Sequence, residues 1–441
     1  MRRSCGRGVC TWLVPRPPSS RDPCSCSRLC LRAATATRFR GPASRVDVAA
    51  RGSMMDRCDV LIVGGGPSGS ACAWKLRRAG LDVVIMDRSR FPRDKACAGW
   101  ITPPVLDDLQ LDVDEYRRGR TFQPITGFRT GTIDGRPPST VPYGRAVSYG
   151  IRRRQFDEYL LRRSGARLTL GAPVASIERQ DGQWVLNGEV SAPMLVGAGG
   201  HFCPIARRLN MPAPLPTPLV VAQEMEFPIA AADAPTIPID PEVPELYFCA
   251  DMKGYGWCFR KEEYLNVGFG RLDPRSLPGA TSAFVRFLVA TRRLPSHLTW
   301  RWSGHAYLVH EPPYRRIVDQ GVVLVGDAAG LARTQSGEGI RAAIESGLFA
   351  ADAIIAAAGR YSLDRLDGYR ARIAQRFGAS LASQALSRLV PDPVKASAAR
   401  ALLRIPGFVR HVVLNQWFLG TGDVPVGGAS DPAPHRAGSN A

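Results

Sequence analysis

The chain has 441 residues, of which 45% are hydrophobic and 22% are charged, and these values are ordinary for a globular protein long enough for two domains. Its formal net charge of +19 is not ordinary and favours anionic cofactors, phosphate-bearing substrates or an anionic membrane surface as ligands. The basic residues accompany no nucleic-acid recognition module, so we expect no nucleic acid as a partner. No run approaches the ~20 apolar residues of a membrane span.

Residues 1–54 differ in composition from the rest of the chain. They hold 11 arginines against Asp22 and Asp47, which gives +9, and they contain five of the 11 cysteines. The segment is rich in Arg and Ser, like a transit peptide, and the alternative is that the protein starts at Met54 or Met55. On either interpretation we expect a disordered leader outside the fold.

The remaining six cysteines are scattered and lack the paired spacing of a zinc site. This pattern favours a reducing compartment without a disulfide framework, and hence a cytoplasmic protein with no metal centre.

Residues 58–87 predict a strand, a tight turn, a helix and a second strand. Residues 60–63 are all apolar, as in a strand buried on both faces. Residues 68–79 have helical character, and residues 81–86 predict the second strand. This order is typical of a dinucleotide-binding unit.

Three glycines of this unit have the G-x-G-x-x-G spacing. Gly64 permits the tight turn, Gly66 lets the backbone approach a pyrophosphate, and Gly69 lets the helix pack close to the strand. Ser68 opens the helix, whose first N–H groups would face the phosphates. Asp87 ends the second strand, where a carboxylate can accept hydrogen bonds from a ribose. The motif alone does not choose between NAD and FAD.

The middle of the chain predicts an excursion into a second domain. Residues 122–141 predict a pair of strands around Asp134-Gly135. Residues 153–163 predict a helix, and its first residue, Arg153, can pair with a cofactor phosphate. Residues 211–245 are rich in proline and alanine, and residues 255–270 alternate as paired strands do.

A second glycine-rich segment follows a buried strand at residues 321–327. The strand ends at Gly326 and Asp327, and the carboxylate of Asp327 can accept a hydrogen bond from a ribityl hydroxyl. Gly337, Glu338 and Gly339 then open a helix whose N–H groups can face a flavin edge and a phosphate. Helices are also expected at residues 363–390 and at residues 394–419, the latter broken at residues 405–407.

Residues 56–375 resemble the FAD-dependent geranylgeranyl reductase family, within the larger para-hydroxybenzoate hydroxylase-like flavoproteins. The resemblance rests on the first glycine motif, on FPRDKACAG at residues 91–99, on GDAAGL and SGEGI at residues 326–340, and on GYGWCF at residues 254–259. Two positions depart from the family pattern: Gly199 replaces an aspartate, and Arg260 replaces a proline.

The resemblance implies an α/β fold: a doubly wound FAD-binding domain with an inserted mixed β-sheet substrate domain and C-terminal helices. The FAD-binding domain would comprise residues 55–125, 146–210 and 311–375. The substrate domain would comprise a hairpin at residues 126–145 and residues 211–310. C-terminal helices would occupy residues 376–420, and a flexible tail residues 421–441.

The resemblance also implies the site residues. Cys97 and Tyr255 are the candidate catalytic residues, because the reduction of an alkene needs a proton and a thiol is mostly protonated at neutral pH. Tyr255, Trp257, Phe259 and Arg260 are expected to bind substrate. Non-covalent FAD would be held by Gly64, Gly66, Ser68, Gly69, Asp87, Arg88, Lys95, Cys97, Arg153, Gly326, Asp327, Gly337, Glu338, Gly339 and Ile340.

The leading interpretation is an FAD-dependent reductase of C=C bonds in an isoprenoid-type or other apolar substrate. The alternatives are an FAD-dependent monooxygenase of an aromatic or polycyclic substrate and a non-catalytic binder of prenylated proteins. NAD(P)H or a reduced electron carrier such as ferredoxin would supply the electrons, and the oligomeric state stays open. Residues 394–419 combine basic and apolar side chains and could lie on an anionic bilayer.

Overall fold

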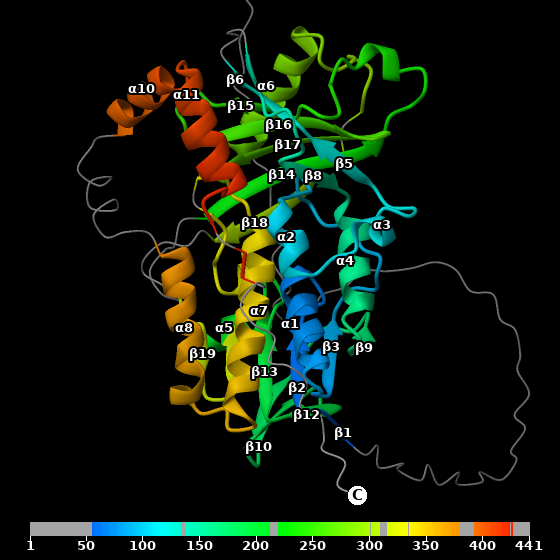
Figure 1. Ribbon diagram of the computed structural model, residues 1–441, viewed down its shortest axis with the longest axis vertical. Coiled ribbons are helices and arrows are strands. Elements are labelled where there is room, and N and C mark those ends of the chain that lie inside the picture. Colours follow the sequence, from blue (N-terminus) through cyan, green and yellow to red (C-terminus); the bar gives the residue numbers. More distant parts are fainter. Residues whose placement is uncertain are drawn as a thin grey trace, which may run out of the picture. The chain divides into compact units, whose positions relative to one another are not determined.

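The computed structural model describes residues 55–133, 138–211, 219–299, 301–308, 315–333, 335–378, 392–423 and 425–426. The predicted leader, the Asp134-Gly135 turn and most of the predicted tail lie outside these residues. The described residues belong to one compact unit, whose arrangement of layers is shown in Figure 1.

A six-stranded sheet forms the first half of this unit, with the strand order β19-β20-β13-β2-β3-β9. The pairs from β20 to β9 are parallel, and only the edge strand β19 is antiparallel. Its strands are β2 (Val60–Val63), β3 (Val83–Asp87), β9 (Arg167–Leu170), β13 (Met194–Gly197), β19 (Val318–Asp319) and β20 (Val322–Leu324).

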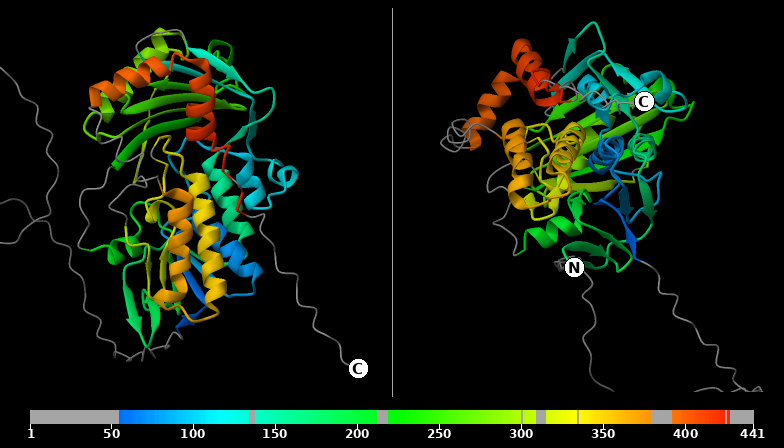
Figure 2. Two further views of the ribbon diagram at one scale, coloured as in Figure 1. Left: turned by 60° about the vertical axis from the view of Figure 1, so that its left-hand side comes forward. Right: turned by 60° about the horizontal axis from the view of Figure 1, so that its bottom comes forward.

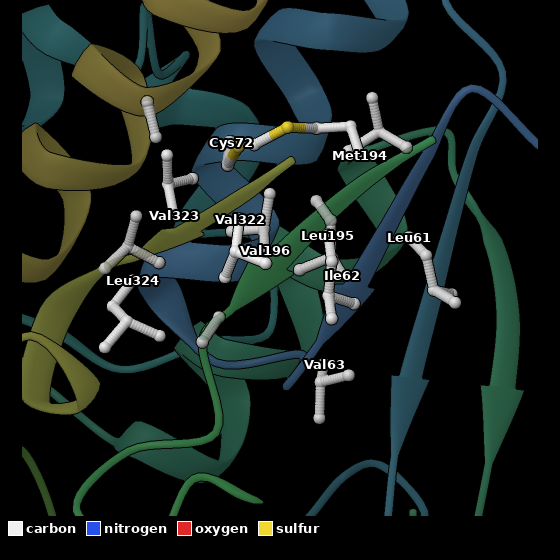
Figure 3. Close-up of a cluster of buried hydrophobic side chains, with 14 of the residues drawn as sticks. Leu61, Ile62, Val63, Cys72, Met194, Leu195, Val196, Val322, Val323 and Leu324 are labelled. Carbon is white, nitrogen blue, oxygen red and sulfur yellow. The ribbon is translucent and has the colours of Figure 1, made fainter. Parts of the chain in front are cut away.

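Helices and a small sheet cover these strands, because the central strands β2, β13 and β20 are apolar and buried on both faces (Figure 3). Figure 1 shows α1, α7 and α8 side by side along the sheet. The helices of this half are α1 (Pro67–Arg78), α4 (Arg153–Arg163), α5 (Pro204–Leu209), the 3₁₀ turn η2 (Gly326–Ala328), α7 (Ile340–Ala357) and α8 (Leu363–Phe377). The small sheet contains β1 (Asp56–Arg57), β10 (Ile177–Gln180), β11 (Gln183–Leu186) and β12 (Val190–Ala192).

A seven-stranded mixed sheet forms the second half, with the order β18-β14-β17-β16-β15-β6-β7. Only β15 and β6 pair in parallel. Its strands are β6 (Gly127–Thr132), β7 (Ser139–Pro142), β14 (Leu219–Pro228), β15 (Glu245–Phe248), β16 (Gly254–Lys261), β17 (Tyr264–Arg271) and β18 (Ser303–Leu308), and the 3₁₀ turn η1 (Ala234–Thr236) precedes β15. These sheets and helices confirm the predicted fold class.

Two helical segments cover the seven-stranded sheet. Helix α6 (Leu277–Ala290) packs on one face, where a Cβ atom at Gly256 would come within 2.5 Å of the Phe284 ring. The C-terminal π-helix η3 (Val409–Leu419) lies across the strands (Figure 2, left) and buries Val413 and Phe418 against Trp257 and Phe259. It follows α10 (Asp392–Leu402) and α11 (Pro406–Phe408). The helical segment is therefore broken at residues 403–405, and the predicted break at residues 405–407 overlaps it only at Ile405.

The prediction for residues 122–141 is wrong in part, because the segment contains three strands rather than two. Strand β5 (Phe122–Ile125) pairs with β8 (Ser148–Ile151), which also pairs with β4 (Trp100–Ile101). The pairing changes at Thr126, whose N–H donates to the carbonyl of Glu242 and whose carbonyl accepts from Tyr143. Two short helices, α2 (Pro103–Asp108) and α3 (Val113–Tyr116), precede β5.

Candidate active site

One continuous cavity of about 900 Å³ is lined by residues of both large sheets. It begins at the turn between β2 and α1, passes the end of β3 and the loop at residues 93–100, and reaches the strands β14, β16 and β18. The turn at residues 336–340, which leads into α7, lines it from another side. The volume lies in the range of sites for cofactors and small molecules.

The first glycine motif shapes the cofactor end of the cavity. Gly64 has φ +115°, and a Cβ atom there would lie 2.3 Å from the carbonyl oxygen of Ala198. A Cβ atom at Gly69 would lie 2.0 Å from the Gly64 carbonyl oxygen, so helix α1 packs directly on the turn. At Gly66 a Cβ atom would instead point toward Arg93 Nη2 at 3.4 Å, and Gly66 lines the cavity. The motif therefore leaves open space at the position where a pyrophosphate would approach.

The N-terminus of helix α1 also lines the cavity. Gly66 is its N-cap residue and supplies no side-chain cap for the first N–H groups, and Ser68 in the first turn lines the cavity. Such an uncapped helix start is a ready site for phosphate oxygens.

Asp87 lies at the carboxyl end of β3, as its position in the motif predicts. Its Oδ2 accepts a hydrogen bond from the N–H of Gly65 (2.8 Å), and its Oδ1 accepts one from the N–H of Ser89 (2.8 Å). These bonds fix the carboxylate, whose remaining lone pairs can accept from ribose hydroxyls. Arg88 lines the same end of the cavity.

Arg153 lines the cavity, but its guanidinium is already engaged. Its Nε and Nη2 donate to the two carboxylate oxygens of Asp157 at 2.7 and 2.8 Å. Burial opposes the charge of Arg153, yet the carboxylate of Asp157 raises its pKa overall. Arg93 belongs to the FPRDKACAG segment but is not among the predicted FAD-binding residues, and it lies 3.2 Å from Asp157 and faces Gly66. Arg93 is therefore the better-placed partner for a phosphate.

A chain of three polar side chains links the two halves of the cavity. Lys95 Nζ lies 2.8 Å from His305 Nδ1, and His305 Nε2 lies 3.2 Å from Asp327 Oδ2. Burial lowers the pKa of Lys95 to about 8. Burial opposes the ionisation of Asp327, but its hydrogen bond with His305 and the charge of Lys95 lower its pKa to about 2. The carboxylate of Asp327 is therefore ionised near neutral pH and can accept from hydroxyl groups.

The second glycine-rich turn packs against strand β18. Gly337 has φ +68°, and a Cβ atom there would lie 2.1 Å from the hydroxyl of Tyr307. Glu338 Oε1 accepts from the N–H of Arg341 (2.7 Å), and Gly339 is the N-cap residue of α7 without a side-chain cap. Gly337, Glu338, Gly339 and Ile340 all line the cavity. Gly326 does not line it, and its N–H donates to Ser346 Oγ (2.9 Å) at the start of η2.

Cys97, Tyr255 and Trp257 lie together at the other end of the cavity. The Tyr255 hydroxyl donates to the carbonyl of Ser336 (2.5 Å), and burial raises its pKa well above 10.0. The sulfur of Cys97 accepts from the N–H of Gly99 (3.4 Å) and also faces the guanidinium of Arg153.

Phe259 and Arg260 do not line the cavity, and the geometry gives no support to their predicted contact with substrate. Phe259 is buried at 5.8 Å from the ring of Trp100, within the core beneath η3. Arg260 lies on the other face of β16 by strand alternation, and its Nε donates to the carbonyl of Glu262 (2.8 Å).

This donor set fits FAD. An uncapped helix start lies beside an open glycine surface, the Asp87 carboxylate ends β3, and the Asp327 carboxylate follows β20 in the turn η2. The cationic side chains of Arg93 and Lys95 also line the cavity, Arg93 facing Gly66 and Lys95 near Asp327. The described residues contain no group of His, Cys, Asp or Glu that could hold a metal ion.

Known proteins resemble the chain in both sequence and structure. Residues 59–135 match the family of FAD dependent oxidoreductases. Geranylgeranyl diphosphate reductase of Rhodobacter capsulatus is 32% identical over 68% of this chain and 75% of its own length. Menaquinone reductase of Mycobacterium tuberculosis is 29% identical over 68% of this chain and 77% of its own.

A solved structure shares the fold. It is a geranylgeranyl bacteriochlorophyll reductase-like protein from Thermoplasma acidophilum, with a TM-score of 0.67 and 21% identity over 83% of this chain and 98% of its own. The sequence match to the reductase from R. capsulatus and the geometry of the cavity lead to one conclusion. The chain is an FAD-dependent oxidoreductase and belongs to the geranylgeranyl reductase family.

Proposed function

We propose that this enzyme reduces carbon–carbon double bonds of an isoprenoid-type substrate. The observation that carries the proposal is the continuity of one cavity from the glycine turn at Gly66 to the aromatic side chains of Tyr255 and Trp257. The names of the relatives point to geranylgeranyl and quinone substrates. Both kinds of compound present apolar carbon to such a surface.

The two ends of the cavity would bind different molecules, FAD at one end and the apolar substrate at the other. At the first end, the N–H groups of α1, the Asp87 and Asp327 carboxylates and the Arg93 guanidinium would hold FAD non-covalently. Bound FAD supplies hydride chemistry to a carbon placed against it. At the other end, Tyr255 and Trp257 would orient the apolar chain and exclude water.

A proton has to reach the second carbon of the double bond. Tyr255 and Cys97 are the acids that the sequence predicts. The hydroxyl hydrogen of Tyr255 is directed at the Ser336 carbonyl, and the sulfur of Cys97 acts as an acceptor toward Gly99. With their polar atoms engaged in this way, both side chains would shape the binding of the substrate.

The electron donor and the location of the enzyme are further parts of the proposal. NAD(P)H or a reduced electron carrier would reduce the flavin. Helix α10 and the residues after it expose Val394, Leu402 and Ile405 beside basic residues, which suits peripheral contact with an anionic membrane. Among the described residues, no helix combines the length and apolar character of a membrane-spanning segment.

Anaerobic photoreduction followed by addition of geranylgeranyl diphosphate tests the function. The flavin absorbance should recover without oxygen, and mass spectrometry should find a product heavier by two hydrogens. A flavin that stays reduced with polyprenyl substrates, together with a hydroxylated aromatic product in air, would instead establish the monooxygenase alternative.

A further inference from the structure

One carboxyl group of the cavity has no part in holding the cofactor. Glu224 lies on β14, within the segment 221–224 that lines the substrate end. It pairs with Gly268 of β17, which in turn pairs with Trp257 of β16. A Cβ atom at Gly268 would lie 2.1 Å from the Trp257 ring, so the indole occupies the space above this glycine. Glu224 therefore stands beside the aromatic surface proposed for the substrate.

A buried amide fixes the carboxyl group in this position. Nδ2 of Asn266, a fully buried residue, donates to Glu224 Oε2 (2.7 Å) and to the carbonyl of Cys97 (3.3 Å). Its Oδ1 accepts from Trp257 Nε1 (2.7 Å), which sets the orientation of the amide. Glu224 is thus held between the Cys97 loop and the indole, with only 7% of its surface exposed.

The surroundings of Glu224 keep a substantial fraction of its carboxyl groups protonated near neutral pH. Burial raises its pKa to about 7, Lys261 on β16 opposes the rise, and Glu226 on its own strand adds to it. Hydrogen bonds from Asn266 and from the backbone of Cys97 also lower the pKa. On β18 the paired residue is Ser303, which carries no charge.

Lys261 does not cancel the effect of burial, because other groups engage its ammonium. Its Nζ is fully buried, donates to the carbonyl of Ile151 (2.9 Å) and lies 3.3 Å from Glu226 Oε2. Glu226 in turn contacts Arg152 at 3.1 Å.

We propose that Glu224 is the general acid that completes the reduction of the double bond. The step rests on the proposed function: hydride adds to one alkene carbon, and the carboxyl O–H bond of Glu224 breaks as its proton bonds to the other carbon. Two C–H bonds replace the π bond, the reduced flavin is oxidised, and Glu224 is left as a carboxylate. A proton from solvent then restores the acid.

Glu224→Gln tests the assignment, because glutamine keeps the shape and the hydrogen bond but is no acid. After anaerobic photoreduction, reoxidation by geranylgeranyl diphosphate should slow by about 10²–10⁴-fold, the usual contribution of general acid catalysis. Reoxidation by ferricyanide, which transfers no proton to carbon, should stay unchanged. Glu263→Gln, the same substitution at an exposed position outside the cavity, should keep the alkene rate near that of the wild type.

The pH dependence separates an acid from a packing residue. The wild-type alkene rate should fall as pH rises through about 7, and the Gln variant should lose this dependence. An infrared band of a protonated carboxyl group should titrate in the same range in the wild type and be absent from the variant, whatever its activity.

Several results would overturn the assignment. A Gln variant within about threefold of the wild-type alkene rate, far below the usual range for an acid, would leave Glu224 structural. If the Gln variant does not bind FAD, the wild type alone still tests the assignment. An alkene rate of the wild type that does not change from acidic to alkaline pH would overturn the role of Glu224 as the acid. A wild-type flavin that geranylgeranyl diphosphate does not reoxidise at all would refute the proposed function instead, and the infrared titration would still report on Glu224.

Discussion

Replacing Glu224 by glutamine should change the pH dependence of folding, independently of any turnover. Burial raises the pKa of Glu224 from its ordinary value of 4.5 to about 7. At 1.36 kcal/mol per pH unit, ionising the carboxyl group in the folded protein costs about 3 kcal/mol relative to the unfolded chain. Because the pKa is raised on folding, the stabilising effect is fully present below pH 4.5 and is lost as pH rises to about 7.

Glutamine is neutral throughout, so the variant should not lose this stability. Near pH 4.5 and below, glutamine and the protonated acid are both neutral and of similar shape, and the two proteins should differ little in their free energy of unfolding. Above pH 7 the variant should be more stable than the wild type by about 2–3 kcal/mol, within the limits of the shift from 4.5 to about 7.

Urea unfolding followed by tryptophan fluorescence, in excess FAD at each pH, would measure this difference. Equal excess of cofactor is needed because binding to the folded state adds to the measured stability. Other groups titrate in the same range, but they are common to both proteins and cancel in the difference. Parallel stability curves for the two proteins between acidic and alkaline pH would show that Glu224 is ionised at neutral pH, and the reasoning from its burial would fail.

Further predictions concern the cofactor, the thiol and the membrane. Gly66→Glu should yield a colourless protein, because a side chain in the space beside Arg93 blocks the pyrophosphate; a variant with full flavin absorbance would contradict this. Cys97→Ser should keep FAD and reoxidise with the alkene within about threefold of the wild type, whereas a loss of about 10²–10⁴-fold would return the role of acid to the thiol. Val394→Asp with Ile405→Asp should reduce flotation with anionic vesicles, because both side chains are about half exposed beside basic residues. Leu363→Asp on α8, also exposed, is the control and should float like the wild type.

Much of the fold follows from local pattern. The strand at residues 60–63 and the helix at residues 153–163 have the predicted bounds, because buried apolar runs and amphipathic spacing act over a few residues. The segment at residues 122–141 does not, since the partner of β5 is β8 and the exchange of sheets at Thr126 depends on Glu242, more than 100 residues away. Such pairing has no local signal.

The candidate site divides in the same way. Glycine and carboxylate positions of the cofactor end are predictable because the motif is contiguous and each residue has one geometric task. Arg153 and Arg93 show the limit. The motif does not distinguish them, whereas in the structure Asp157 holds the guanidinium of Arg153 through two hydrogen bonds and that of Arg93 through one contact of 3.2 Å, which favours Arg93 as the partner of the phosphate.

The substrate end depends on neighbours across three strands. In sequence, Glu224 is an acidic residue in an alternating strand, and an acidic residue in such a pattern usually faces solvent. Two residues of the neighbouring strand β17 explain the burial of Glu224. Gly268, directly opposite, leaves space for the ring of Trp257, and the amide of Asn266, two residues earlier on β17, donates to the carboxyl group. None of these residues is unusual by itself, and their conjunction arises only when β14, β17 and β16 pair in this register. This register buries the carboxyl group of Glu224 and so raises its pKa into the range of an acid catalyst. A motif read from single residues could therefore not have identified Glu224.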